Sequence, residues 1–197
     1  MQRIEASIEM SLAAKKILSI KPELAYRLFY PQVPMIICSR HNEEVAGMTA
    51  NSAMSVSDSP PMVALAVNEK SRTQRVIKNS RMFSVNWLSY DESTSRKAVF
   101  ELSRPFKGTK EQSDKLRACR IPYSLIKRTP VLKRAEAFGI CEVASSRKTG
   151  DHILFIAKVI QAEATSDFIR DGYWEFKKYE PMLYLGSNRS EPLTTLR

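Results

Sequence analysis

The chain has 197 residues, of which 43% are apolar and 26% are charged, as expected for a folded domain with one buried core. No apolar stretch approaches the roughly 20 residues that a membrane-spanning helix requires, and the first residues lack the hydrophobic core of a secretion signal. The net charge of +10 comes from basic residues spread along the sequence. Without a tight basic tract or interleaved aromatic residues, this charge does not favour a nucleic-acid partner.

The three cysteines, Cys38, Cys119 and Cys141, are far apart in the sequence and odd in number. They show neither the spacing of metal ligands nor that of a disulfide framework. This usage is typical of a protein kept in a reducing compartment, so we expect a cytoplasmic protein without a metal site.

The predicted elements, in chain order, begin with a helix over residues 8–18, which forms the main part of an N-terminal helical extension (residues 1–30) and ends at Lys21-Pro22. Alternating or continuous apolar patterns predict strands at residues 34–39, 45–48, 62–67, 82–88, 135–145, 152–162 and 181–186. Short helices are predicted after Ser71 and within residues 91–120, and residues 191–197 form a polar tail. Many short strands with few helices between them predict a mainly β fold, an antiparallel barrel with short peripheral helices.

Two clusters within this pattern indicate a binding site. Residues 47–57 are almost all small or carry one hydroxyl or amide, so their backbone can approach a flat polar ligand closely. Ser71, Arg72 and Thr73 place two hydroxyls and a guanidinium at the start of a predicted helix, a combination suited to a phosphate. Each cluster also has a purely structural interpretation, a bulged strand and loop for the first and a helix cap for the second.

Four ordered pieces of the sequence resemble the flavin reductase-like family, whose fold is the FMN-binding split barrel. These pieces are residues 47–52 with 55–57, Pro60-Pro61, residues 70–73 and Gly150-Asp151-His152. The resemblance spans roughly residues 30–186 and places the domain at residues 31–190. It implies a Greek-key split barrel, a homodimer and non-covalently bound FMN, with FAD as the alternative.

The resemblance also implies roles for individual residues. The cofactor-binding set is Met48, Thr49, Ala50, Asn51 and Ser52 at the flavin ring and ribityl chain, with Lys70, Ser71, Arg72 and Thr73 at the phosphate. His152 is implied to lie near the nicotinamide and flavin rings as the catalytic residue. Its alternative role is a hydrogen bond to a carbonyl beside its own turn.

The function that the resemblance implies is an NAD(P)H-dependent flavin reductase, which passes hydride to flavin N5 and then electrons to a monooxygenase or another redox protein. No Gly-x-Gly-x-x-Gly fingerprint of a separate dinucleotide domain is present, so NADH or NADPH is expected to stack on the flavin in a shared cleft. Two alternatives stay open: a flavoredoxin-like electron carrier with tightly held FMN, and a non-catalytic flavin- or haem-binding module.

Overall fold

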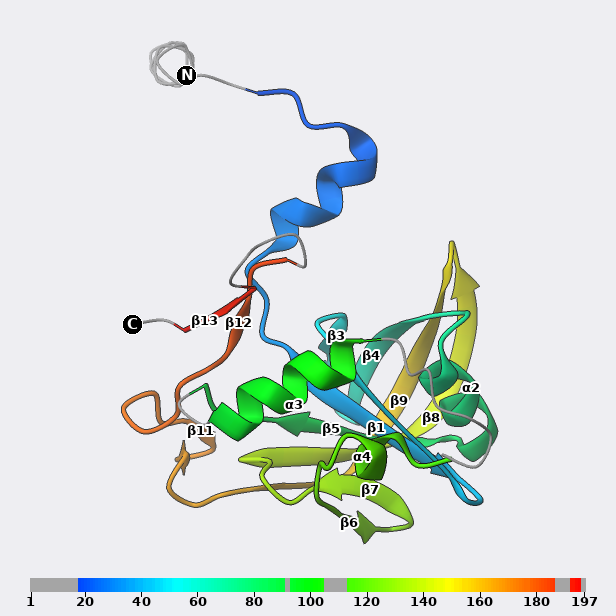
Figure 1. Cartoon of the computed structure of the whole chain (residues 1–197), viewed down its shortest axis with the longest axis vertical. Helices are drawn as coiled ribbons and strands as arrows, with labels where there is room; N and C mark the ends of the chain where they lie inside the picture. Colours follow the sequence, from blue (N-terminus) through cyan, green and yellow to red (C-terminus); the bar gives the residue numbers. More distant parts are fainter. Residues whose placement is uncertain (1–17, 91–92, 105–112, 187–191, 196–197) are drawn as a thin grey trace. The chain divides into compact units, whose positions relative to one another are not determined.

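In the computed structural model, one seven-stranded antiparallel sheet forms the centre of the fold (Figure 1). The structure describes residues 18–90, 93–104, 113–186 and 192–195. The strands of the sheet are β1 (Met35–His41), β2 (Glu44–Ala50), β3 (Ala53–Asp58), β4 (Pro61–Asn68), β5 (Met82–Trp87), β8 (Ala137–Thr149) and β9 (His152–Ala164). Their order across the sheet is β2-β1-β5-β8-β9-β4-β3. The predicted mainly β, antiparallel architecture is therefore confirmed.

The sheet is strongly rolled, because its two outermost strands are neighbours in the sequence. Only Asn51 and Ser52 connect β2 at one edge with β3 at the other. A flat sheet of seven strands would separate these edges by roughly 29 Å, whereas a two-residue link spans about 10 Å. The Ser52 hydroxyl donates a 2.6 Å hydrogen bond to the Ala66 carbonyl of β4 where the edges approach. The edges are not paired along their length, so the barrel stays open on this side.

The remaining elements are short. They are the helices α2 (Arg72–Ser80), α3 (Ser93–Ser103) and α4 (Lys115–Ala118), the hairpin of β6 (Tyr123–Ile126) and β7 (Thr129–Leu132), and the strand pairs β10 (Ile169–Arg170) with β11 (Tyr173–Trp174) and β12 (Leu183–Tyr184) with β13 (Leu193–Thr194). A 3-10 helix, η1 (Pro22–Phe29), belongs to a unit that ends at Tyr30, separate from the sheet unit of Pro31–Arg197. None of the helices in the described residues is long and apolar enough to cross a membrane.

Two hydrophobic cores cover the two faces of the rolled sheet. The apolar run of β1 serves both, because Met35 and Ile37 point into the barrel whereas Ile36 and Cys38 point outward. The outer core lies beneath α3 and α4, which pack on β1 and β2 (Figure 1). Burial on both faces explains why β1 is continuously apolar rather than alternating.

Helix α2 forms where the sequence predicted a helix after Ser71. The Ser71 hydroxyl accepts a 3.1 Å hydrogen bond from the Gln74 N–H, which makes Ser71 the N-cap. Val76 and Ile77 are fully buried, and Arg81 ends the helix in the left-handed conformation with φ 61°. The cap anchors this helix against β1, β2 and β5, so its first turn has a fixed position beside β2.

Three local predictions differ from the structure or lie outside it. Lys21-Pro22 was predicted to end a helix, but Pro22 begins η1, a position that suits proline because its missing N–H has no intrahelical partner there. The predicted helix at residues 8–18 falls on residues 1–17, outside the described ones, apart from its last residue. Residues 123–132, where the sequence predicted no strand, form the β6–β7 hairpin.

Candidate functional site

The two predicted clusters line a single cavity of about 450 Å³, which we call the inner cavity. Six of the predicted residues line it: Met48, Thr49, Lys70, Ser71, Arg72 and Thr73. Strand β2 supplies the first two, and the turn after β4 with the first residues of α2 supplies the others. Residues far apart in the sequence therefore meet at one site whose volume falls within the range of small-molecule pockets.

Several side chains of the first cluster are used by the fold. Ala50 is buried in the barrel core, and the Ser52 hydroxyl is bonded to β4. The Thr49 hydroxyl donates a 2.5 Å hydrogen bond to the Val99 carbonyl of α3. Ala50, Asn51 and Ser52 do not line the inner cavity, and β3 contains a bulge between Ser55 and Ser57. The structural interpretation of this cluster thus holds for most of its side chains.

Gly47 has a packing role that the sequence did not reveal. A Cβ atom at this position would lie 2.7 Å from Leu116 Cδ2 of α4, closer than two carbon atoms can approach. The missing side chain lets α4 pack directly on β2. Since α4 begins at Lys115, Gly47 indirectly positions a residue of the inner cavity.

The second cluster both caps α2 and lines the inner cavity. Ser71 caps α2, as one of the two sequence interpretations predicted. Thr73 is only 4% exposed and lines the inner cavity, and its hydroxyl makes no hydrogen bond to another described residue. The first N–H groups of a helix lack intrahelical acceptors and carry partial positive charge. This turn therefore presents donors that suit an anion.

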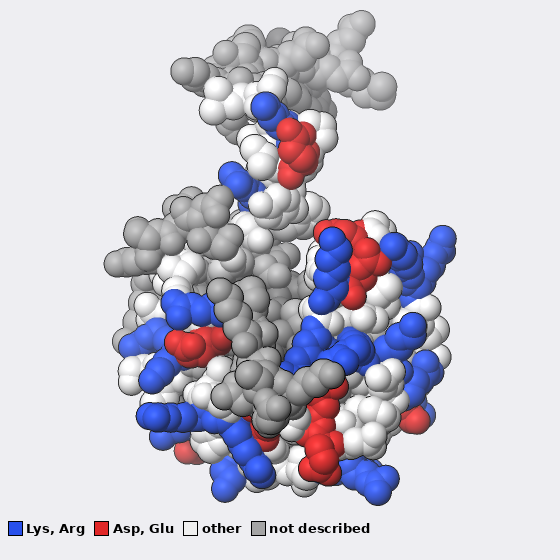
Figure 2. Space-filling model, turned by 45° about the vertical axis from the view of Figure 1, so that its right-hand side comes forward, with Lys and Arg blue, Asp and Glu red and all other residues white. Residues whose placement is uncertain are grey.

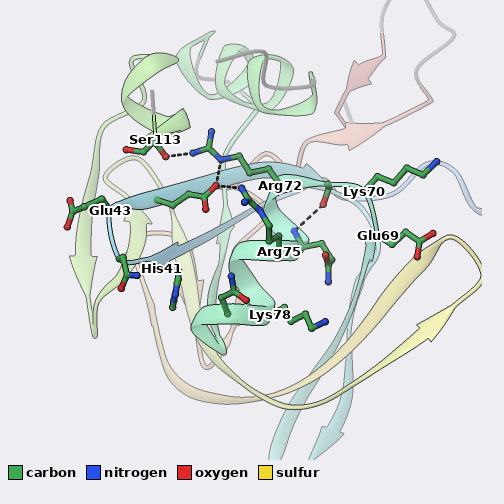
Figure 3. Close-up of a pocket in the computed structure, with 13 residues that line it drawn as sticks. His41, Glu43, Glu69, Lys70, Arg72, Arg75, Lys78 and Ser113 are labelled. Atoms are coloured by element: carbon green, nitrogen blue, oxygen red, sulfur yellow. Dashed lines mark hydrogen bonds and ion pairs between the residues drawn. The ribbon is translucent and has the colours of Figure 1, made fainter. Parts of the chain in front are cut away.

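The Arg72 guanidinium is held by groups of the protein. Its Nε donates a 2.7 Å bond to Glu44 Oε1 of β2, and its Nη2 donates to the Ser113 carbonyl (Figure 3). Arg75 reaches the same Glu44 oxygen at 2.6 Å. Two guanidinium groups thus share one carboxylate beside the inner cavity.

Lys115 also lines the inner cavity and was missed by the sequence prediction. It is 6% exposed, and its ammonium donates hydrogen bonds of 3.1 Å and 3.0 Å to the Leu102 and Arg104 carbonyls at the end of α3. Burial lowers the pKa of the Lys115 ammonium, and the charge of Arg72 acts in the same direction. Within the described part of the chain no carboxylate pairs with Lys115. An anion in the cavity would therefore stabilise the charged form of Lys115, which burial destabilises.

His152 lies outside the lining of the inner cavity, at the tip of the β8–β9 hairpin. Its Nδ1 is 2.7 Å from Asp151 Oδ1, and this hydrogen bond lowers the pKa of the Asp151 carboxyl. In the sheet, however, His152 is paired with Asn68, which does line the cavity. The His152 side chain, which is 42% exposed, therefore lies near the rim of the inner cavity. One of its ring nitrogens is hydrogen-bonded to Asp151.

Taken together, the inner cavity offers backbone and apolar contacts from β2 and cationic or hydroxyl donors from α2, β4 and α4. Further lining residues that the predicted set lacked are Ala46, Asn68, Leu102, Ser103, Arg104 and Lys115. Such a division suits a ligand with a flat, partly apolar portion and an anionic portion. A flavin with its phosphate fits this donor set, because a buried lysine without an acid partner and the unbonded Thr73 hydroxyl both match a phosphate.

Comparison with known proteins identifies the same class of domain. The model of the flavin reductase like domain matches residues 26–190. An uncharacterised protein from Aeropyrum pernix is 27% identical over 167 residues; the match covers 85% of this chain and 62% of the relative, so the chain spans less than two thirds of that relative.

Two further relatives have named activities. The reductase component of 4-nitrophenol 4-monooxygenase/4-nitrocatechol 2-monooxygenase from Rhodococcus opacus is 28% identical, over 66% of this chain and 64% of its own length. An NADH-dependent flavin reductase from Rhodococcus sp is 26% identical, over 75% of this chain and 71% of its own.

Among solved structures, an FMN-binding protein from Thermus thermophilus superimposes with a TM-score of 0.75 at 21% identity, over 92% of this chain and 95% of that one. This likeness confirms the predicted split-barrel fold.

Proposed function

The chain belongs to the flavin reductase-like family, and on that premise we propose that its inner cavity binds flavin and that the protein is an NAD(P)H-dependent flavin reductase. The observation that carries the proposal is the meeting of β2 and the first turn of α2 at one cavity, which brings Met48 and Thr49 together with Lys70 and Thr73. When bound, a flavin supplies a hydride acceptor at N5 and a store for two electrons.

We assign the phosphate to the cationic and hydroxyl side of the cavity. Thr73 and the N-terminal N–H groups of α2 donate to it, and the charges of Lys70, Arg72 and Lys115 attract it. The isoalloxazine ring then extends along β2, where the backbone from Thr49 to Asn51 contacts its polar edge. Ala50 and Asn51 act through their backbone in this arrangement, since neither side chain lines the cavity.

His152 is proposed to orient the nicotinamide at the rim of the cavity. His152 is paired with Asn68, the last residue of β4, which lines the inner cavity. A nicotinamide that enters the cavity to stack on the flavin would therefore pass His152. A relative is named for NADH, which supports NADH as one of the two donors to test. Asp151 fixes the orientation of the imidazole through the bond to Nδ1 and leaves Nε2 for a contact with the donor.

We also propose a homodimer and an oxygenase partner. Met54 and Val56 on the edge strand β3 are 65% and 46% exposed, an apolar pair that a second copy of the chain can cover. The Rhodococcus opacus relative is a reductase component, which supports delivery of reduced flavin to a separate monooxygenase. Light scattering of the purified protein measures the mass of the assembly, and we expect the mass of a dimer.

The experiment that tests the function is an absorbance spectrum after addition of FMN or FAD and desalting, followed by NADH and NADPH under anaerobic conditions. Retained yellow colour that bleaches with a pyridine nucleotide supports the proposal and identifies the donor. Colour that stays unbleached favours an electron carrier with a protein donor instead. If titration calorimetry detects no binding of either flavin, the proposal is wrong.

A further inference from the structure

Beside the inner cavity lies a second, larger depression of about 1060 Å³, which we call the α2 groove and whose lining residues are drawn in Figure 3. The two spaces share Lys70, Ser71 and Arg72 as lining residues. The two spaces thus adjoin at the start of α2. A ligand whose phosphate lies at this turn can continue from the inner cavity into the α2 groove.

The α2 groove has an excess of positive charge. Arg72, Arg75 and Lys78 follow one another at intervals of three residues, which places them along one side of the helix. Figure 3 shows this series together with Lys70 and Glu69, and with Glu43 and His41 from the β1–β2 hairpin. Basic side chains are also spread over the face of the molecule in Figure 2, with several close together on its right-hand side.

The acidic residues of the groove offset this charge only in part, because two of the three pair with cations outside the groove lining. Glu44 is shared by Arg72 and Arg75, Glu69 lies 2.7 Å from Lys148, and Glu43 lies 3.5 Å from Arg40. Lys70 and Lys78, in contrast, form no ion pair with any of the described residues. An anion in the groove would therefore meet two uncompensated ammonium groups.

The side chain of Gln74, a largely buried residue, also lines the groove. Gln74 is 8% exposed and lines the groove, and its side chain makes no hydrogen bond to another residue in the described part of the chain. The amide of Gln74 is therefore available to a ligand in the groove. Gln74 follows Thr73 in the same helical turn. Thr73 lines the inner cavity, whereas Gln74 lines the α2 groove.

The far end of the groove suits a purine. Asn42 and Asn79 line it, and a side-chain amide can both donate to and accept from the edge of adenine. His41 provides a ring on which a base can stack. From Arg72 to Lys78 the helix rises about 9 Å, a distance that a second phosphate, a ribose and a base together can bridge.

From these features, and resting on the proposed flavin site, we propose that the α2 groove binds the adenylate half of FAD. The flavin mononucleotide portion occupies the inner cavity, and the second phosphate passes Arg72 and Gln74 toward Arg75 and Lys78. The adenine lies beside Asn42 and Asn79. The protein accordingly prefers FAD to FMN, and Arg75 and Lys78 determine this preference without contacting the ring.

The test compares dissociation constants for riboflavin, FMN and FAD by titration calorimetry in the wild type, Lys78→Ala and Arg75→Ala. The wild type is expected to bind FAD about tenfold more tightly than FMN, the gain typical of one additional charge-assisted contact. Each variant should lose about five- to tenfold in affinity for FAD and less than about twofold for FMN. Lys158→Ala, which removes an exposed lysine of β9, is the matched control and should change neither.

The FMN arm separates this inference from the proposed function. Equal affinities for FMN and FAD in the wild type, or equal losses of both in the variants, would overturn the adenylate assignment and leave the flavin site standing. No binding of any flavin would overturn both. An increase in KM for NADH or NADPH in the variants, with an unchanged ratio of FAD to FMN affinity, would assign the groove to the adenylate of the electron donor and not to FAD.

Discussion

The two clusters that meet at the inner cavity differ in how far the fold uses their side chains. On β2 and its link to β3, Thr49 is bonded to α3, Ala50 is in the barrel core, and Ser52 is bonded to β4. At the start of α2, Lys70 and Thr73 face the cavity without such bonds to the described residues. A contribution of the first cluster to binding must therefore come mainly from its backbone, whereas the second can bind through its side chains.

This difference predicts that a substitution in the first cluster changes stability more than ligand affinity. Gly47→Ala places a Cβ atom 2.7 Å from Leu116 Cδ2, and we expect a loss of about 1–3 kcal/mol in the free energy of unfolding. Thermal and urea denaturation measure it. Gly139→Ala is the matched control, because the nearest side-chain atom would lie 3.9 Å from its Cβ, and it should be neutral. Equal effects at both glycines would contradict close packing of α4 on β2.

Lys115 tests the cationic side of the cavity. Lys115→Met keeps most of the volume of the side chain but removes its charge, and we expect the affinity for FMN to fall about tenfold or more. Riboflavin, which lacks the phosphate, should lose less. Lys158→Met removes a lysine on the surface of β9 and serves as the control. If riboflavin and FMN lose affinity equally, Lys115 contacts the ring and not the phosphate.

The lowered pKa of Lys115 adds a dependence on pH that the same variant should abolish. Between this lowered pKa and the ordinary value of 10.5, the unfolded chain binds more protons at Lys115 than the folded chain does. The free energy of unfolding of the flavin-free protein is therefore expected to rise with pH in this window through the contribution of Lys115. FMN affinity should fall over the same window as the ammonium loses its charge. Denaturation and binding curves of wild type and Lys115→Met, measured against pH, separate the two effects.

Thr73 gives the sharpest contrast with the first cluster. Thr73→Val retains the shape of the side chain and removes a hydroxyl that bonds to no described residue, so stability should change by less than about 0.5 kcal/mol. FMN affinity is expected to fall about tenfold, as for the loss of one hydrogen bond to a charged group, while riboflavin affinity stays constant. Ser71→Ala is the informative comparison, because loss of the N-cap costs about 1 kcal/mol of stability. A destabilised Thr73→Val protein with unchanged FMN binding would assign Thr73 to the fold alone.

The sequence predicted β8 from the alternation of its apolar residues, and β1 from a continuous apolar run that is buried on both faces. It missed the β6–β7 hairpin because the turn residues, Lys127 and Arg128, have φ of 47° and 65° without the Asn-Gly pair that usually marks such a turn. At the site it identified the residues of α2, whose types match a phosphate directly. The sequence did not predict Lys115, because a lysine in a charged segment is usually exposed to solvent. Its burial depends on the packing of α4 against Gly47, a residue far away in the sequence.

His152 lies outside both clusters, and its substitution should have the smallest effect of those considered. The side chain is at a hairpin tip and does not line the inner cavity, so His152→Ala should leave the melting temperature and the FMN affinity unchanged. If it orients the nicotinamide through one hydrogen bond of about 1 kcal/mol, flavin reduction by NADH should slow about fivefold. Stopped-flow absorbance at saturating flavin measures this rate, and Asp151→Asn, which keeps the imidazole but weakens its support, should give a smaller decrease. An unchanged reduction rate in His152→Ala would show that the donor enters the cavity without passing the β8–β9 hairpin.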